Sequence, residues 1–122
     1  MLILFDQATP APLRPYLKGH LIRTAAQQGW DRLENGLLLN AAERGGFDIL
    51  LTTDKNMGYQ QNLSGRRIAV VVLGRQNWAD LKPYAQLVVE AVNGVTPGSY
   101  REVEIPFRRP APPAQDTGLK GN

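Results

Sequence analysis

The chain has no cysteine, a single histidine and no long apolar segment. Without cysteine it has no disulfide framework, no thiolate metal site and no thiol nucleophile. The opening MLILFDQ is too short an apolar run, and reaches an acid too early, for a signal peptide. Nowhere do eighteen apolar residues follow one another, as a membrane-spanning helix would need. These absences predict a soluble, cytoplasmic protein that does not enter a membrane.

An excess of charge of one sign is also lacking from most of the chain. The formal net charge is +3, but residues 1–106 carry 11 Lys and Arg against 10 Asp and Glu, and residues 107–122 carry 3 against 1. The main part therefore lacks the strong positive field of a dedicated nucleic-acid binder, although a local basic patch is compatible with it.

The length of 122 residues and a hydrophobic content of 43% suffice for one core. We expect one domain over residues 1–105. Residues 106–122 form a proline-rich tail without apolar periodicity, for which the sequence predicts disorder.

Hydrophobic patterning predicts alternating strands and helices. Apolar or β-branched runs predict strands over Leu2–Phe5, His20–Thr24, Phe47–Leu51, Ile68–Leu73 and Ser99–Ile105, the last as an edge strand. Helical spacing or turn chemistry predicts helices over Pro12–Leu17, Asn35–Arg44 and Trp78–Asn93. This order predicts an α/β fold with three layers and a mostly parallel central sheet.

The stretch GGFDILLTTDKN, residues 45–56, organises this prediction. A glycine pair ends one helix, and the apolar segment that follows reads as a strand covered on both faces. Asp54 comes just past the carboxyl end of that strand, and Asp6 occupies the same position after the first strand. Ligands bind at this edge in open α/β sheets, so the two carboxylates converge if the strands are neighbours.

Converging carboxylates are suited to Mg²⁺ or Mn²⁺, which prefer oxygen ligands and keep several waters. Such an ion activates water for phosphodiester hydrolysis. The sequence therefore makes Asp6 and Asp54 candidate metal ligands and candidate catalytic residues.

Asp6 after the first strand, the helix NGLLLNAAERGG and the turn TTDKN together resemble the small PIN-like domains, which include nucleases of bacterial toxin/antitoxin pairs. The resemblance covers roughly Met1 to Leu73. It implies a PIN-like fold, metal-dependent cleavage of RNA by clustered acids and, as partners, RNA, a small antitoxin-like protein and a second copy of the chain.

The resemblance carries over position by position. Asp6 and Asp54 match two of the acids, whereas amides stand at three positions where acids are usual. Those three residues are secondary candidates: Gln7, Asn35 and Asn56. Their carbonyl oxygens can coordinate a hard cation but bring no charge. Glu43 in the predicted helix is the best substitute for a third acid.

Several charged and aromatic side chains flank the predicted crevice and are candidates for binding RNA. Phosphate contact requires positive charge, and an unpaired base stacks on an aromatic ring. The candidates are Lys55, Arg66, Arg67 and Arg75 for phosphate and Tyr59 for a base. The alternatives are solvated loop charges and, for Tyr59, packing.

The other candidates also have purely structural interpretations. Asp54 could cap a turn, Asn35 could be the N-cap of its helix, and Glu43 could be a surface acid. His20 is best interpreted as a structural residue.

Two other functions compete with the nuclease. A phosphoacceptor receiver domain would need an acidic pair after the first strand and a lysine after a later one, but the chain has Gln7 and Arg75 there. A catalytically impaired binding module is the stronger rival because of the three amides. The resemblance favours a metal-dependent ribonuclease acting as the toxin of a toxin/antitoxin pair.

Overall fold

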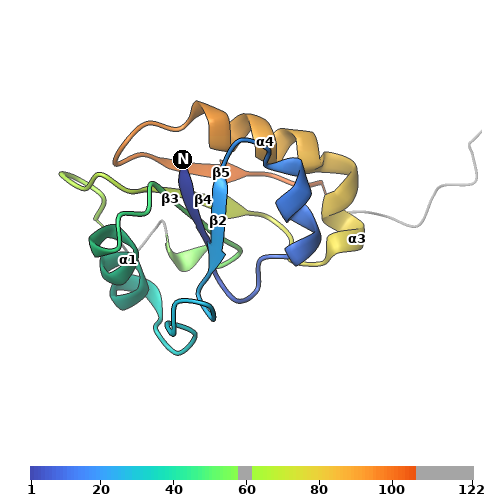
Figure 1. Cartoon of the computed structure of the whole chain (residues 1–122). Helices are drawn as coiled ribbons and strands as arrows, with labels where there is room; N and C mark the ends of the chain where they lie inside the picture. Colours follow the sequence, from blue (N-terminus) through green and yellow to red (C-terminus); the bar gives the residue numbers. More distant parts are fainter. Residues whose placement is uncertain (58–61, 107–122) are drawn as a thin grey trace, which may run out of the picture.

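A parallel β-sheet forms the centre of the molecule (Figure 1). The computed structural model describes residues 1–57 and 62–106. The sheet has five strands in the spatial order β2-β1-β3-β4-β5, and every neighbouring pair is parallel. The strands are β1 (Leu2–Phe5), β2 (Leu21–Thr24), β3 (Ile49–Thr52), β4 (Ala69–Leu73) and β5 (Tyr100–Val103). The α/β class and the parallel sheet predicted from the sequence are confirmed.

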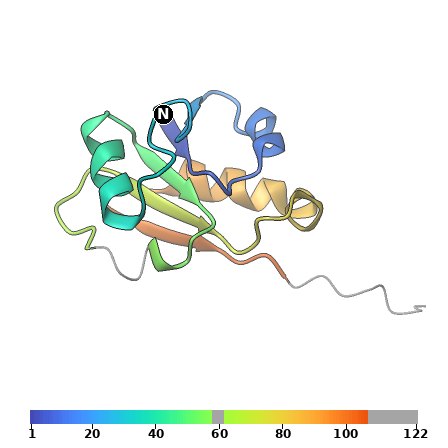
Figure 2. The same cartoon turned by 90° about the horizontal axis from the view of Figure 1, so that it is seen from below.

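Helices cover the two faces of the sheet, which gives three layers (Figures 1 and 2). Helix α1 (Asn35–Arg44) lies on one face. The other face carries the 3-10 helix η1 (Ala11–Tyr16), helix α3 (Trp78–Leu81), the 3-10 helix η2 (Lys82–Tyr84) and helix α4 (Ala85–Gly94). Chain segments that leave β1 and β2 thus pass on opposite faces.

The strands form because their apolar side chains are buried on both faces of the sheet. Side chains alternate across a strand, so Ile3 and Phe5 join the core under η1 and α4, while Leu4 joins the core under α1. In β3, all four residues from Ile49 to Thr52 are buried. This double burial explains the nearly continuous apolar run in the sequence.

Prolines make two helical segments less regular than the sequence predicted. Pro12 and Pro15 lie in the first segment, which is a 3-10 helix. The expected helix over Trp78–Asn93 is wrong as one element, since it is divided into α3, η2 and α4. Pro83 stands at the division, where it lacks an N–H to donate and its ring crowds the preceding turn.

The strand order reverses between β1 and β3, and this reversal positions the site. The chain winds from β1 to β2 in one direction and then crosses to β3 and β4 in the other. In doubly wound sheets a crevice opens outside the carboxyl ends of the strands at such a switch point. The residues that follow β1 and β3 are those from Asp6 and from Thr53 onward.

Among the described helices, none has the length and apolar character needed to cross a lipid bilayer. Residues 107–122 of the predicted tail, and Tyr59, lie outside the described residues.

Candidate functional site

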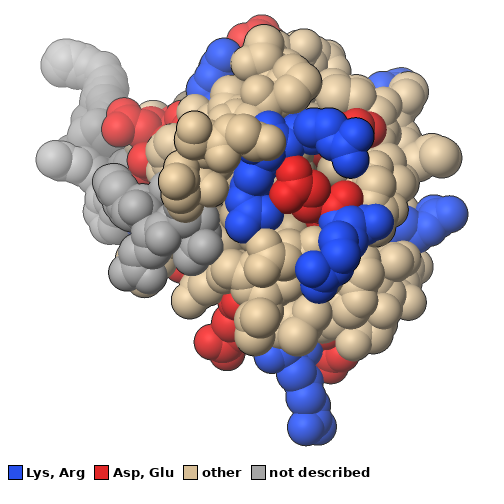
Figure 3. All heavy atoms as spheres, turned by 90° about the vertical axis from the view of Figure 1, so that its left-hand side faces the viewer, with Lys and Arg blue, Asp and Glu red and all other residues tan. Residues whose placement is uncertain are grey.

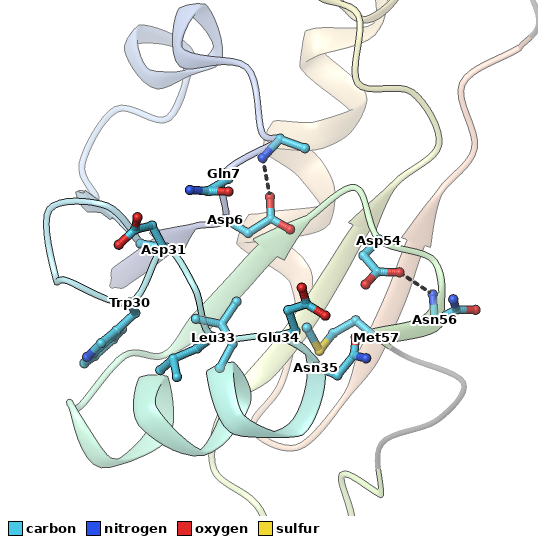
Figure 4. A pocket seen from close by; sticks show the side chains of 13 residues that line it. Asp6, Gln7, Trp30, Asp31, Leu33, Glu34, Asn35, Asp54, Asn56 and Met57 are labelled. Carbon is cyan, nitrogen blue, oxygen red and sulfur yellow. Dashed lines mark hydrogen bonds between the residues drawn. The ribbon is translucent and has the colours of Figure 1, made fainter.

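A cavity of about 390 Å³ lies at the switch point, and four carboxylates line it. We call it the acidic cavity; its acids are Asp6, Asp31, Glu34 and Asp54. Figure 4 shows Asp6, Glu34 and Asp54 around one open space, with Asp31 and Trp30 farther to the side. The predicted convergence of Asp6 and Asp54 is therefore present, and two further acids accompany them.

Asp6 is held firmly at the end of β1. Its Oδ1 accepts a hydrogen bond from the Ala8 backbone N–H at 3.2 Å, and the Thr9 hydroxyl lies 2.8 Å away. The Thr9 hydroxyl is also 2.9 Å from the Leu51 carbonyl oxygen, which fixes it against β3. These contacts orient the carboxylate before any ligand binds.

Thr52 connects the two central acids. Its hydroxyl donates a hydrogen bond to Asp6 Oδ2. The Thr52 hydroxyl oxygen also accepts a hydrogen bond from the Asp54 backbone N–H at 3.0 Å. Thr52 is fully buried at the end of β3. The threonine therefore fixes the spacing between Asp6 and Asp54. Sequence reasoning assigned it no role, although the threonine pair before an acid was the available signal.

Asp54 has both a turn role and an open oxygen. Its Oδ1 accepts from the Asn56 backbone N–H at 3.0 Å, which is the turn-capping geometry considered from the sequence. Among the described residues, no side chain or backbone group bonds to its Oδ2. The side chain is half-buried and lines the acidic cavity, so capping leaves one oxygen available to a ligand.

Asp31 and Glu34 were missed because neither follows a predicted strand directly and neither lies in the motifs of the resemblance. Both belong to the loop between β2 and α1. In a parallel sheet that whole loop starts from the carboxyl edge, so acids far along it can return to the site. The available signal was the spacing in DRLEN, where two acids precede the helix.

The predicted N-cap at Asn35 is wrong. Glu34 is the N-cap of α1, without a side-chain capping bond, and Asn35 is the first helical residue with φ +47°. Asparagine tolerates this left-handed conformation better than most residues, which explains its presence there. The three amides of the sequence prediction, Gln7, Asn35 and Asn56, all line the acidic cavity.

The nominated cations lie at opposite edges of the sheet. Lys55 and Arg75 line a neighbouring cavity of about 510 Å³ at the carboxyl edge. Arg66 and Arg67 precede β4 and therefore lie at the amino edge, so their expected position beside the crevice is wrong. Arg66 donates to Glu43 Oε1 and to Asn40 Oδ1, each at 2.7 Å.

Glu43 is also at the amino edge, and its role as a third acid of the cluster is excluded by its position. It lies in the last turn of α1, about 12 Å along the helix from Asn35 at the usual rise per residue. The Arg67 backbone N–H, which donates to its Oε2 at 2.8 Å, and the Arg66 guanidinium lower the pKa of Glu43 against an opposing effect of burial. Glu43 is a structural anchor for the loop before β4.

Two further residues have structural contacts. Nε2 of His20 is 2.8 Å from Asn93 Oδ1, which joins the start of β2 to the end of α4. Trp78 packs against Tyr16. The structural interpretation of His20 agrees with these contacts.

The chemistry of the acidic cavity suits a hard divalent cation, because its polar lining consists of carboxylate and amide groups. Within the described residues, no three acidic, histidine or cysteine side chains are grouped as a ready metal site. An ion there would consequently have few direct protein ligands and would keep several waters, as Mg²⁺ commonly does. Asp6 and Asp54, joined through Thr52, are the residues that would hold it.

The fold and the site together define a parallel α/β protein with an acidic cavity at its switch point. Compared with family models, curated proteins and solved structures, the chain gives no significant match. The strand order is also that of flavodoxin-like doubly wound folds. The position after β4 at which the sequence analysis expected the lysine of a receiver domain is nevertheless occupied by Arg75.

Proposed function

We propose that the protein is a metal-dependent ribonuclease of PIN-like type. The observation that carries this proposal is the pair of half-buried carboxylates, Asp6 and Asp54, that Thr52 joins at the switch point of a parallel sheet. Like charges brought together destabilise a fold, so their grouping indicates a role in binding a cation. The resemblance of TTDKN and its preceding strand to PIN-like domains supplies the reaction class.

Each residue has a distinct role in the proposed reaction. Asp6 and Asp54 would bind Mg²⁺ or Mn²⁺ directly or through water, and Thr52 would keep the two carboxylates in register. A bound divalent ion supplies neutralisation of phosphate charge and an acidified water for phosphodiester hydrolysis. The open Oδ2 of Asp54 orients the attacking water. Glu34 and Asp31 add negative charge around the same space.

The biological part of the proposal is that this ribonuclease is a cytoplasmic toxin, neutralised by a small antitoxin-like protein, and that it acts as a homodimer. The resemblance to nucleases of toxin/antitoxin pairs supports this part. Co-expression with the product of a small adjacent gene should relieve growth inhibition by the chain, whereas an unrelated small protein should not.

The chemical test is cleavage of single-stranded RNA with and without metal. We expect cleavage in Mg²⁺ or Mn²⁺, none in EDTA, and at least a hundredfold loss in Asp54→Asn. Asparagine preserves the oxygen that accepts the Asn56 N–H, so this variant removes charge and leaves the turn intact. Asp48→Asn is the matched control because Asp48 accepts the Leu2 N–H at the opposite edge. Cleavage that persists in EDTA or in Asp54→Asn would rule out the mechanism.

A binding module without catalysis is the second candidate, and one observation favours it. Both oxygens of Asp6 and one oxygen of Asp54 already accept hydrogen bonds within the protein. Titration calorimetry with Mn²⁺ separates the two functions. The nuclease requires heat of binding that disappears in Asp6→Asn, whereas absence of heat at millimolar Mn²⁺ with the fold intact selects the binding module.

A further inference from the structure

A second cavity adjoins the acidic cavity on the β2 side. Its cation, Arg14, is not among the phosphate-binding candidates predicted from the sequence. This cavity has a volume of about 470 Å³, within the range of small-ligand sites. We call it the Arg14 cavity; it lies between η1 and the ends of β1 and β2, and Arg14, Thr9 and Thr24 contribute to its lining. Asp6 and Gln7 line both cavities and thus form their shared wall.

The guanidinium of Arg14 is available to a ligand. Among the described residues, no acidic side chain pairs with it and no hydrogen bond engages it. The guanidinium of Arg66, by contrast, already donates hydrogen bonds to Glu43 and Asn40. An arginine that lines a cavity and pairs with no acidic side chain is suited to a bidentate contact with phosphate.

Cations therefore stand on both sides of the acids along the carboxyl edge. Arg14 lies on the β2 side, and Lys55, which directly follows Asp54, lines the cavity on the β4 and β5 side. Acidic and basic side chains are also intermixed on the side of the molecule that carries α1 (Figure 3). A polyanion that crosses the carboxyl edge therefore meets Arg14 on one side of the acids and Lys55 on the other. Glu102 and Glu104 line the same cavity as Lys55.

We propose that the Arg14 cavity is a nucleotide-binding subsite of a single-stranded polynucleotide that crosses the carboxyl edge of the sheet. Arg14 contacts the phosphate next to the one held at the acidic cavity, and the strand continues past Asp6 and Asp54 to Lys55. This subsite deepens the proposed nuclease function, on which it rests for the identity of the central phosphate.

Single strands fit this geometry better than a duplex. Asp6 and Gln7 form the wall between the Arg14 and acidic cavities, and an unpaired strand bends over such a wall more easily than a duplex does. The neutral main domain supplies few other phosphate contacts, so each cation contributes a large share of the affinity.

The experiment measures binding without metal, so that it is independent of cleavage. Fluorescence anisotropy in EDTA would follow labelled single-stranded RNA, single-stranded DNA of the same sequence and duplex RNA over a range of salt concentrations. Arg14→Gln is compared with Arg44→Gln. The second variant also removes one positive charge, but at the last residue of α1, away from the carboxyl edge of the sheet. Circular dichroism would verify that both variants are folded.

We expect Arg14→Gln to weaken binding of single-stranded RNA at least threefold and to reduce the slope of log K against log salt by about 0.7, the value for one contact to a single strand. Arg44→Gln should change neither quantity. Equal losses for RNA and DNA would identify a pure phosphate contact, and a larger loss for RNA would add a contact to the 2′-hydroxyl.

Absence of wild-type binding, equal losses in both variants, or a duplex preference that is independent of Arg14 would overturn the subsite. The outcome for the nuclease is separate. Binding that depends on Arg14, together with absence of cleavage in Mg²⁺ and Mn²⁺, would retain the subsite and reject the hydrolytic function. If Asp54→Asn abolished cleavage and Arg14→Gln did not affect binding, the hydrolytic function would be retained and the subsite rejected.

Discussion

At the scale of single residues, the arrangement of the site depends on Thr52 as much as on the acids. One buried hydroxyl donates to Asp6 Oδ2 and accepts from the Asp54 N–H. A side-chain oxygen that bonds to both residues in this way holds the ends of β1 and β3 together as one site. Residues that orient metal ligands commonly change metal affinity when they are removed.

Thr52→Val should therefore weaken Mn²⁺ binding about tenfold and destabilise the fold by about 1–2 kcal/mol. Valine fills the same volume, but it leaves the Asp54 N–H without an acceptor and releases one oxygen of Asp6. Calorimetric titration with Mn²⁺ and urea unfolding would measure the two effects.

Two variants separate the role of the hydroxyl from a general effect of mutation. Thr52→Ser retains the hydroxyl and should retain most of the Mn²⁺ affinity. Thr53→Val changes the adjacent threonine, which does not bond to either acid in the described structure, and should leave affinity unchanged. Wild-type Mn²⁺ affinity in Thr52→Val would show that the threonine serves only the fold.

At the scale of elements, the sequence predicted which strands exist but could not place everything that their loops bring together. β3 and β4 were predicted because burial on both faces demands continuous apolar residues, and this demand is visible in ILLT and AVVVL. Asp6 and Asp54 were predicted for the same reason, since Asp6 directly follows β1 and Asp54 is two residues past the end of β3.

The positions of residues in loops were predicted less well than those of residues next to strands. Asp31, Glu34 and Arg14 reach the site along loops or a 3-10 helix, and their distances in sequence from the strands give no direct measure of where they fold. Arg66 was predicted to flank the crevice, yet it precedes β4 and therefore lies at the amino edge. Only the tertiary arrangement distinguishes the two edges.

The ion pair between α1 and the loop before β4 makes a testable contribution to stability. Glu43→Gln should lower the free energy of unfolding by about 1 kcal/mol at pH 7, because it replaces a charge-assisted contact to Arg66 at a half-buried position. Urea unfolding measures the difference from wild type.

The pKa of Glu43 fixes the direction of the pH dependence. This pKa is lowered in the folded protein from the ordinary value of 4.5, so the stabilisation is present above that value and is lost as the pH falls through the lower folded value. The difference between wild type and Glu43→Gln should accordingly shrink on acidification below pH 4.5. Glu90→Gln, on the exposed side of α4, is the control, and a pH-independent difference would contradict the assigned contacts.

At the scale of the whole molecule, the proposed metal site would lose stability without its ion in return for the capacity to bind a cation. Asp6 and Asp54 are half-buried and linked through Thr52, so their negative charges repel each other more in the folded chain than in the unfolded chain. Removing one negative charge relieves this repulsion. A site that binds a cation should therefore show opposite effects of the same variant with and without the ion.

In EDTA, we expect Asp54→Asn to melt at a higher temperature than wild type, because the charge is removed while the turn contact to the Asn56 N–H can persist. In Mn²⁺ the order should reverse. A ligand that binds only the folded state stabilises it by about 1.4 kcal/mol at ten times its dissociation constant, which corresponds to a rise of several degrees in a domain of this size. Thermal unfolding of wild type, Asp54→Asn and the control Asp48→Asn in both buffers measures these shifts. If Mn²⁺ raised the melting temperature of Asp54→Asn as much as that of wild type, the ion would be bound elsewhere, and the acidic cavity would lose its proposed role.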